Sequence, residues 1–414
     1  LNRFFSLKPL LRKIRICGSK PMAKLIEITG KVLSGEWGTD DESGNGIPVL
    51  RTTNFTNEGI VDYSNVVTRT IQKKNIDAKY LRKGDIIIEK SGGSNKQPVG
   101  RVIYFDGPES TYLFNNFTGL LRVKNQAVWL PRYVFYSLFH NYRKGGTRPF
   151  ESKTTGLHNL KTDDYISRYE VLEAPISEQQ SICKQLDYVY DIIKTRQQQL
   201  QKLDELIKAR FVEMFGDESN PYNFPIVSIE DVASVQVGVV IKPAQYYTDA
   251  DHGIKTFRSL NIGPMHIKDT DWVYFSEEGN RKNQKSVLNE NDLVIVRSGA
   301  PGTACVITKE YAGCNAVDII IARPDLGKVN PYYLCQYTNL PHGKKQIEEG
   351  TGGAAQQHFN VGKYNKIRLT LPPLDQQLKF EKFVEQTDKS KVAVQKSLDE
   401  AQLLFDSLMQ HYFG

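Results

Sequence analysis

The stretch Leu81–Gly93, LRKGDIIIEKSGG, shares one pattern with Leu288–Ala300, LNENDLVIVRSGA, which lies 207 positions later. Each stretch has a polar turn with an aspartate, an aliphatic run typical of a buried strand, a basic residue and a Ser-Gly turn. Just upstream, GIPVLRTTNF (46–55) matches GIKTFRSLNI (253–262) at the same offset. Because self-similarity of this kind marks repeated structural units, the sequence predicts two copies of one domain.

The two copies can be followed to their ends. TTGLHNL (154–160) loosely matches QQHFNV (356–361), and APISEQQ (174–180) matches PPLDQQ (372–377), now at an offset near 200. Loop insertions therefore distinguish the copies, for which we predict the boundaries 23–174 and 217–371. Short β-branched runs between Gly, Asn and Asp turns, interrupted by helical patches, favour an α+β fold with a mixed sheet in each copy.

A long helix is expected after each domain, over residues 175–216 and 372–414. Apolar residues recur there at alternating spacings of four and three, which is the 3.5-residue repeat of a coiled coil. The alternative is two separate amphipathic surface helices, which would not require a matched phase. We expect the helices to pack on each other through Ile182, Leu186, Ile193, Leu200, Leu203, Ile207, Phe380, Val384, Val394, Leu398, Phe405 and Leu408.

Composition narrows the class of protein. The 414 residues carry a formal net charge of +7, a mild basic excess that suits a nucleic-acid partner without proving one. Five scattered cysteines, with no C-x-x-C pair, indicate reduced thiols, a cytoplasmic location and no metal site. Without an apolar run of 18 residues, no membrane span is expected. Residues 1–22, with six basic residues and no acid, are either a basic arm or an upstream extension.

Catalytic motifs are missing from the sequence. It contains no G-x-x-x-x-G-K-[ST] nucleotide loop and no methyltransferase signature. The acid Glu89, which follows one aliphatic run, is replaced by Val296 in the other copy, so a nuclease site is disfavoured. We therefore predict a non-catalytic chain with no cofactor of its own.

Polar and basic loops instead suggest DNA binding. Arg, Lys, Asn, Gln, Ser and Thr are the side chains that hold phosphates or contact base edges. The Ser-Gly turns could present N–H groups to a phosphate, although a tight turn between strands is the simpler interpretation. The residues expected at DNA are Arg51, Asn54, Ser91, Gly92, Arg143, Lys144, Arg148, Lys153 and His158 in the first copy, and Arg258, Asn261, Arg297, Ser298, Lys344, Gln356, Gln357 and His358 in the second.

The order of these motifs resembles a known family. A variable α+β domain with GD-aliphatic-SG, an APISEQQ or PPLDQQ turn, and the helix LQKLDELIKARFVEMFG (200–216), duplicated once, is similar to the specificity subunit of type I restriction–modification systems. The resemblance covers roughly residues 22–414. Residues 1–22 precede the usual start of the family, and Ala174 stands where the second copy has Pro372.

The resemblance carries specific implications. Each domain would be a target recognition domain for one half of a split double-stranded DNA sequence, and the helices would form an antiparallel spacer. The helices would dock two methyltransferase subunits, and endonuclease-translocase subunits would join that core. Methylation and ATP-dependent cleavage would belong to those partners.

Two other classes stay open at this point. One is a coiled-coil scaffold with paired ligand-binding domains and no role at DNA, which a lack of salt-dependent DNA binding would favour. The other is a self-contained restriction or modification enzyme, which would need a catalytic motif on this chain. Sequence alone also leaves the helices free to be parallel or antiparallel.

Overall fold

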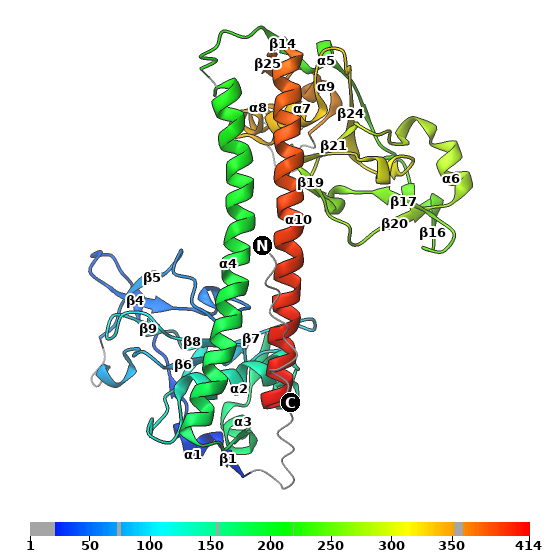
Figure 1. Cartoon of the computed structure of the whole chain (residues 1–414). Coiled ribbons are helices and arrows are strands. Elements are labelled where there is room, and N and C mark those ends of the chain that lie inside the picture. The colour runs from blue at the N-terminus through cyan, green and yellow to red at the C-terminus, as the bar shows by residue number, and fades with distance from the viewer. Residues whose placement is uncertain (1–20, 73–75, 155–156, 218, 352–358) are drawn as a thin grey trace, which may run out of the picture. The chain divides into compact units, whose positions relative to one another are not determined.

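The computed structural model describes residues 21–72, 76–154, 157–217, 219–351 and 359–414 (Figure 1). The chain divides into two compact units. Unit 1 contains Leu1–Lys194 with Leu398–Gly414, and unit 2 contains Thr195–Ser397. The predicted basic extension, 1–22, lies outside the described residues except for Pro21 and Met22.

Unit 1 is built on short, mostly antiparallel sheets. The first has the order β2 (Leu33–Ser34), β10 (Thr118–Leu121), β6 (Ile86–Glu89), β8 (Val102–Tyr104). The second has the order β3 (Thr39–Asp40), β5 (Val67–Thr70), β4 (Ile47–Leu50), β9 (Leu113–Phe114), with β4 and β9 parallel. The third has the order β11 (Glu151–Thr154), β12 (Leu157–Leu160), β7 (Ser91–Gly92). Strands β1 (Met22–Lys24) and β13 (Glu170–Leu172) pair antiparallel.

The described residues of this domain also form the helices α1 (Leu25–Thr29), α2 (Pro131–Arg143) and α3 (Thr162–Arg168). Helix α2 begins with proline at its first position, where the missing N–H costs nothing. The aliphatic run of β6 is buried on both faces, since Ile86, Ile87 and Ile88 are all fully buried. A continuous apolar run is what a strand covered on both faces requires.

Unit 2 repeats this plan. Its two larger sheets have the orders β15 (Ala233–Val237), β24 (Ile319–Pro324), β21 (Leu293–Val296), β22 (Ala304–Val306) and β16 (Tyr247–Thr248), β20 (Val273–Phe275), β17 (Ile254–Phe257), β23 (Asn315–Ala316). Two pairs are β14 (Ile226–Ser228) with β25 (Arg368–Thr370) and β18 (Ile262–Gly263) with β19 (His266–Ile267). Its helices are α5 (Ile229–Val232), α6 (Glu277–Lys282), α7 (Pro331–Asn339), α8 (Pro341–Thr351) and α9 (Val361–Asn365).

Strand order and direction agree between the units. The aliphatic strand of each quoted stretch, β6 or β21, is third in its sheet and pairs antiparallel on both sides. In each unit the strand before the repeated Arg, β4 or β17, pairs parallel with β9 or β23. The mixed α/β fold and the duplication predicted from the sequence are therefore present in the topology.

The aspartate of the repeated stretch has a structural role in both copies. The Asp85 carboxylate accepts the backbone N–H of Arg82 and two guanidinium bonds from Arg122, at 2.7 and 2.6 Å. Asp292 accepts the N–H of Asn289 and the Nε–H of Arg323. Both carboxylates are buried. A buried carboxylate needs such partners, so the repeated motif closes a turn and anchors a neighbouring strand.

The units differ after α2 and α7. Unit 1 continues into a short 3-10 turn, η4 (Arg148–Phe150), and the antiparallel strands β11 and β12. Unit 2 continues into helix α8. The stretches 141–159 and 342–360, which the sequence places as equivalents, thus have different local structures.

Two long helices follow the domains: α4 (Ile176–Phe215) and α10 (Leu374–Phe413), each of 40 residues. Both helices pass from one unit into the other. Their bounds agree closely with the predicted 175–216 and 372–414. Among the described residues, no helix is long and apolar enough to cross a membrane.

Inside each unit, a part of α4 packs against a part of α10. In unit 1, Gln185 bonds to Tyr412, and the ring of Tyr190 lies 6.4 Å from that of Phe405. In unit 2, Arg196 bonds to Ser397 and Lys391 forms an ion pair with Asp204. Since positions rise along α4 as they fall along α10, the helix segments run antiparallel within each unit.

The predicted helix-pair residues divide by burial. Ile182, Leu186, Ile193, Ile207, Phe380, Val384, Phe405 and Leu408 are buried. Leu200, Leu203, Val394 and Leu398 are half-buried. The less buried positions fall in the middle of each helix, where polar contacts such as Arg196 with Ser397 take part in the packing.

Candidate nucleic-acid interface and helix attachments

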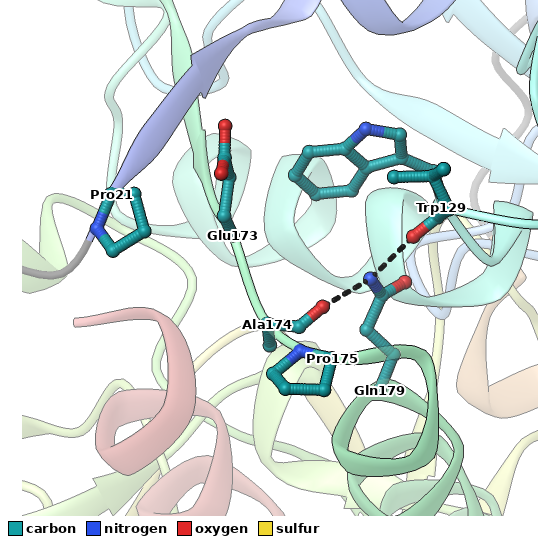
Figure 2. A pocket seen from close by; sticks show the side chains of 7 residues that line it. Pro21, Trp129, Glu173, Ala174, Pro175 and Gln179 are labelled. Carbon is teal, nitrogen blue, oxygen red and sulfur yellow. Dashed lines mark hydrogen bonds between the residues drawn. The ribbon is translucent and has the colours of Figure 1, made fainter.

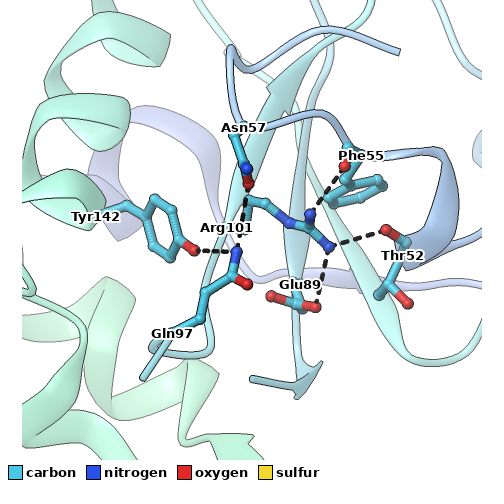
Figure 3. Close-up of polar contacts among 7 residues, drawn as sticks. All are labelled: Thr52, Phe55, Asn57, Glu89, Gln97, Arg101 and Tyr142. Carbon is cyan, nitrogen blue, oxygen red and sulfur yellow. Dashed lines mark hydrogen bonds and ion pairs between the residues drawn. The ribbon is translucent and has the colours of Figure 1, made fainter. Parts of the chain in front are cut away.

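Three loops of unit 1 meet beside Tyr142 (Figure 3). The amide of Gln97 donates to Oδ1 of Asn57 at 3.4 Å and to the Tyr142 hydroxyl at 3.2 Å. The Val99 N–H donates to the Glu151 carboxylate, which ties the same loop to β11. The loops thereby gather exposed polar side chains, namely Thr53, Asn57, Ser94, Asn95, Lys96, Gln97, Lys144 and Arg148.

Arg101 fixes the base of this loop cluster (Figure 3). Its guanidinium donates to the carbonyls of Phe55 and Thr52 at 2.8 and 2.9 Å and lies 3.5 Å from a Glu89 oxygen. Burial raises the pKa of Glu89, against the lowering effect of Arg101. Glu89 is therefore half of a structural ion pair. Among the described residues, no group of three His, Cys, Asp or Glu side chains could hold a metal ion.

Asn54 and Asn261 are turn residues whose side chains bond to the backbone of their own loops. Each accepts the backbone N–H of the Arg three positions before it, Arg51 or Arg258, at 2.9 Å. Their amides donate to backbone carbonyls, Asp62 and Asn65 in one copy and Thr270 in the other. Both side chains are buried. Direct base contact by these two asparagines, which the sequence led us to expect, does not fit this structure.

Arg51 and Arg258 stand at the same turn and are half-buried. Arg51 donates to the Asn65 carbonyl at 3.4 Å, and Arg258 donates to the Asp271 carbonyl at 2.5 Å. Each guanidinium thus holds the loop after its turn, and the two copies use it in the same way. Contact with DNA by either arginine stays a prediction.

Ser91, Gly92 and His158 belong to a sheet, which corrects the phosphate-turn interpretation. Ser91 and Gly92 form β7 and pair with Asn159 and His158 of β12. The Ser91 hydroxyl donates to Oδ1 of Asn159 at 2.7 Å, and its N–H donates to the Phe117 carbonyl. His158 is buried with Nδ1 3.1 Å from a Glu151 oxygen. Asn159 lies 68 positions after Ser91 in the chain. These bonds engage the Ser91 hydroxyl and N–H, the groups that an exposed turn would offer to phosphate.

The basic residues after α2 have separate environments. Arg143 forms a 2.6 Å ion pair with Asp406 of α10, within unit 1, so it binds the long helix. Lys144 and Arg148 are exposed. Lys153 lies on β11, opposite His158, but its side chain lies outside the described part of the structure.

In unit 2, two of the predicted cations hold loops in place. Arg297 donates from Nε to the Phe359 carbonyl at 3.1 Å and from Nη1 to Asp318 at 2.6 Å. Lys344 donates to the Pro301 carbonyl and the Thr303 hydroxyl, and burial lowers its pKa. Lys344 thus closes the loop after β21 and is a poor candidate for phosphate contact. Ser298 is half-buried, and Gln356, Gln357 and His358 lie outside the described residues.

A buried glutamine attaches each long helix to a domain, and Figure 2 shows the one in unit 1, Gln179. Gln179 accepts the Leu130 N–H and donates to the carbonyls of Val128 and Ala174, all at 2.8 Å. It lines a cavity of about 330 Å³ with Trp129 and Pro175. Gln377 accepts the Asn330 N–H and donates to Lys328 and Pro372 in the same manner.

Each glutamine therefore fixes the start of a long helix to the start of α2 or α7. The quoted turns APISEQQ and PPLDQQ contain these glutamines. The sequence does not reveal their role, because the bonded carbonyls, Val128 and Lys328, lie 51 and 49 positions away.

The last residues of each long helix contact the domain helix beside which the other long helix starts, α7 for α4 and α2 for α10. Phe215, from the ending MFG, packs against Tyr333 of α7 with ring centroids 4.8 Å apart. Phe413, from the ending YFG, packs against Tyr133 of α2 at 5.2 Å. Both tyrosines donate to a carbonyl on the last strand of their domain, Thr370 or Leu172. The start of one long helix and the end of the other thus meet at one domain in each unit.

Comparison with known proteins gives matching results. Residues 22–205 match the family model for the type I restriction modification DNA specificity domain. The crystal structure of a type I restriction–modification system S subunit from M. genitalium is similar, with 13% identity and a TM-score of 0.54. That match covers 97% of this chain and 98% of the other.

A second solved structure comes from work on the assembly and conformational transition of the type I R-M system. It has 15% identity and a TM-score of 0.54, over 96% of this chain and 98% of that one. At such identity the likeness concerns the fold. The chain thus has the fold of the S subunits of type I restriction–modification systems, and its residues 22–205 match the DNA specificity domain of these systems.

Proposed function

We propose that this chain is the DNA sequence-recognition subunit of a type I restriction–modification complex and binds a bipartite site, one half through each unit. The observation that carries the proposal is a shared framework with unlike loops. The Asp–Arg pairs, the buried glutamines and the Tyr–Phe contacts recur in both units. The segments after α2 and α7 differ, with strands β11 and β12 in unit 1 and helix α8 in unit 2, as expected of two readers for two different sequences.

The long helices are the second part of the proposal. We propose that α4 and α10 form one antiparallel coiled coil, and that residues 175–216 and 372–414 act as spacers between domains 23–174 and 217–371. A helix of 40 residues spans about 60 Å at 1.5 Å per residue, enough to separate two recognition domains. The antiparallel contacts within each unit support this arrangement.

The partners follow from the same proposal. Two methyltransferase subunits would dock on the helix pair, and endonuclease-translocase subunits would join through the complex. The chain itself would not catalyse methylation or cleavage and would act in the cytoplasm. Glu89, the acid that resembled a nuclease residue, supports this proposal through its structural ion pair with Arg101.

The test is to map methylated adenines in cells that express the chain together with its methyltransferase subunits. A split motif, lost when the chain is omitted, is the expected result. Exchanging residues 23–174 for the corresponding domain of a relative should change one half of that motif only. The same exchange over 217–371 should change the other half.

Two outcomes would refute the proposal. Methylation by the purified chain alone would make it an enzyme. A motif in which both halves change after either exchange would mean a composite site, contrary to one reader per half. A matched control exchanges the same domain for itself with silent codons, which leaves the motif unchanged.

A further inference from the structure

An apolar surface lies on unit 2 where three loops meet. Ile241 is 80% exposed, Leu260 is 60% exposed, and Val240 is 48% exposed. Val240 and Leu260 line a cavity of about 490 Å³ together with Pro243 and Val317. Single exposed apolar side chains are ordinary on a protein surface, but a converging group around a cavity indicates a binding site.

Cationic residues lie next to this apolar surface. Arg258 and Arg297 line the same cavity, and Lys242 follows Ile241 in the chain. The neighbouring acid, Asp318, is already paired with Arg297 at 2.6 Å. Because Asp318 offsets the charge of Arg297, the excess positive charge at the cavity comes from Arg258. The cavity therefore offers apolar groups beside a positive charge, which suits a polyanion that carries apolar groups.

The loop that carries Ile241 is held by the fold. The Gly238 N–H donates to the Ile319 carbonyl at 2.9 Å, and the Val239 N–H donates to the Ala316 carbonyl at 2.8 Å. Gly238 is required here, because a Cβ at this position would lie 2.4 Å from the Ala316 oxygen. These bonds fix the backbone directly before Val240, and a backbone held in place lowers the entropy cost of binding.

DNA has a group that fits this surface. In the major groove, the thymine C5-methyl is the apolar group that base edges present, and apolar side chains contact it directly. Arg258, at the edge of the cavity, would contact a neighbouring phosphate. Leu260 also lies in the turn between Arg258 and Asn261, next to loops that the proposed function assigns to DNA.

We propose that Val240, Ile241 and Leu260 form a surface that reads thymine methyl groups in the half-site bound by unit 2. This inference rests on the proposed function and adds the base chemistry of one half-site. Arg258 positions the surface through a phosphate beside it, while Arg297 stays bonded to Asp318 and the Phe359 carbonyl.

The described residues of unit 1 form no such surface at the equivalent place. Gly35, like Gly238, lies against carbonyls of a neighbouring strand, since a Cβ at Gly35 would lie 2.2 Å from the Phe114 oxygen. Two positions later, Trp37 is covered by the Arg69 guanidinium, 4.2 Å from the ring centroid. Thr53 stands at the position of Leu260. The thymine-reading role is therefore specific to unit 2, and unit 1 serves as an internal control.

The experiment tests whether the loss of binding caused by removing a thymine methyl depends on the apolar side chains of the protein surface. The full chain, assembled with its methyltransferase subunits, is titrated with duplexes that carry the mapped site. In one duplex, thymines of the unit 2 half-site are replaced by deoxyuridine, which removes only the methyl. Each methyl lost should weaken binding by the wild-type complex about fourfold.

The variants decide the assignment. Ile241→Ala and Leu260→Ala should weaken binding to the thymine duplex, and at least one of them should bring the thymine-to-uracil ratio close to one. Deoxyuridine in the unit 1 half-site should act equally on the wild type and the variants. Thr53→Ala should leave the ratio in the unit 2 half-site unchanged. Thermal unfolding of the variants, whose changed side chains are exposed, should match the wild type.

Several results would overturn the inference. A unit 2 half-site without thymine would do so, as would equal uracil effects in the wild type and both variants. Variants that bind DNA normally but fail to assemble with methyltransferase subunits would identify a protein interface instead. If the wild-type complex bound no specific duplex, the proposed function would be overturned as well. If the complex bound its site but the thymine-to-uracil ratio did not depend on the variants, only the thymine-reading inference would fail.

Discussion

Units 1 and 2 agree where they attach to the long helices and differ where they expose loops. The glutamine contacts of Gln179 and Gln377 are the same bond for bond. In contrast, the ion pair of Glu89 with Arg101 in unit 1 is replaced by Val296 and Thr303 in unit 2. In both units the first residue donates its backbone N–H to the carbonyl of the second. The difference indicates that attachment is constrained by geometry, whereas the loop supports can change with the loops they carry.

The largest effect on stability is expected at the contacts of Phe215 with Tyr333 and of Phe413 with Tyr133, in which the two phenylalanines differ in burial. Phe215 is 1% exposed and packs against Tyr333, Phe211 and Phe380. Phe215→Ala should lower the free energy of unfolding of unit 2 by about 3–5 kcal/mol. Phe413 is half-buried, so Phe413→Ala should lower that of unit 1 by about 1–2 kcal/mol.

Chemical denaturation of the full chain measures both effects. The comparison needs the unit 1 and unit 2 transitions to be assigned, for which a tryptophan signal is suitable, since Trp129 is in unit 1 and Trp272 in unit 2. Equal losses for the two variants would show that the aromatic cluster around Phe215 adds nothing to the contact with Tyr333.

The next effect concerns the glutamine contacts and should be equal in the two units. Gln179→Ala or Gln377→Ala leaves a buried N–H and two carbonyls without partners, at a cost of about 1–3 kcal/mol in unfolding free energy. The exposed neighbour Gln180→Ala is the matched control and should stay within about 0.5 kcal/mol of the wild type. A difference between the two buried glutamines well beyond that range would mean that the attachments are not equivalent.

Removing one exposed positive charge from unit 1 should weaken DNA binding, and this effect should be smaller than the stability losses above. Lys96 and Arg148 are exposed, whereas Arg143 is paired with Asp406. Lys96→Ala and Arg148→Ala should each weaken binding to every sequence and reduce the slope of log K against log salt by about one. Arg143→Ala should leave this slope nearly unchanged. A slope that falls only for Arg143→Ala would place the phosphates on the other side of α2.

The framework was predictable from the sequence because its signals are local. The long helices and the mixed sheets follow from patterns within a few dozen residues, such as the polar turn and aliphatic run of 81–89. The repeat follows from finding the same local pattern again 207 positions later. Asn54 and Asn261 had a local signal too, since each bonds three positions back. That Arg-x-x-Asn spacing indicates a turn, and a DNA contact was the wrong interpretation.

The candidate site was less predictable because its geometry depends on distant pairing. Ser91 and His158 have the sequence pattern of loop residues, and only the pairing of β7 with β12 places them in a sheet. Lys96, Asn57 and Gln97 had no signal of their own, and only the meeting of their loops beside Tyr142 brings them together. Ile241 and Leu260 likewise look like ordinary apolar residues, because exposure cannot be read from residue type.

The smallest effect is expected from the ion pair that Glu89 and Arg101 form in unit 1. Burial raises the pKa of Glu89 above its ordinary value of 4.5, since the Arg101 guanidinium offsets the burial only in part. The folded state then binds this proton more tightly than the unfolded state does. Stability from this group is greatest at low pH and falls as pH rises from about 4.5 through the raised pKa, after which it is constant.

Glu89→Gln removes that titration and keeps an oxygen that can accept from Arg101. The difference in unfolding free energy between the wild type and this variant should therefore shift against the wild type as pH rises through the window. The unfolding of unit 2 should not differ between the two proteins, because the substitution lies in unit 1. Denaturation of both proteins from about pH 4 to about pH 8 measures the difference. A shift in the opposite direction would mean that Arg101 outweighs burial and lowers the pKa of Glu89, so that the ion pair stabilises unit 1 at neutral pH. In that case the pair would be a stabilising feature that unit 2 replaces with apolar packing, and the two units would differ in how their loop supports gain stability.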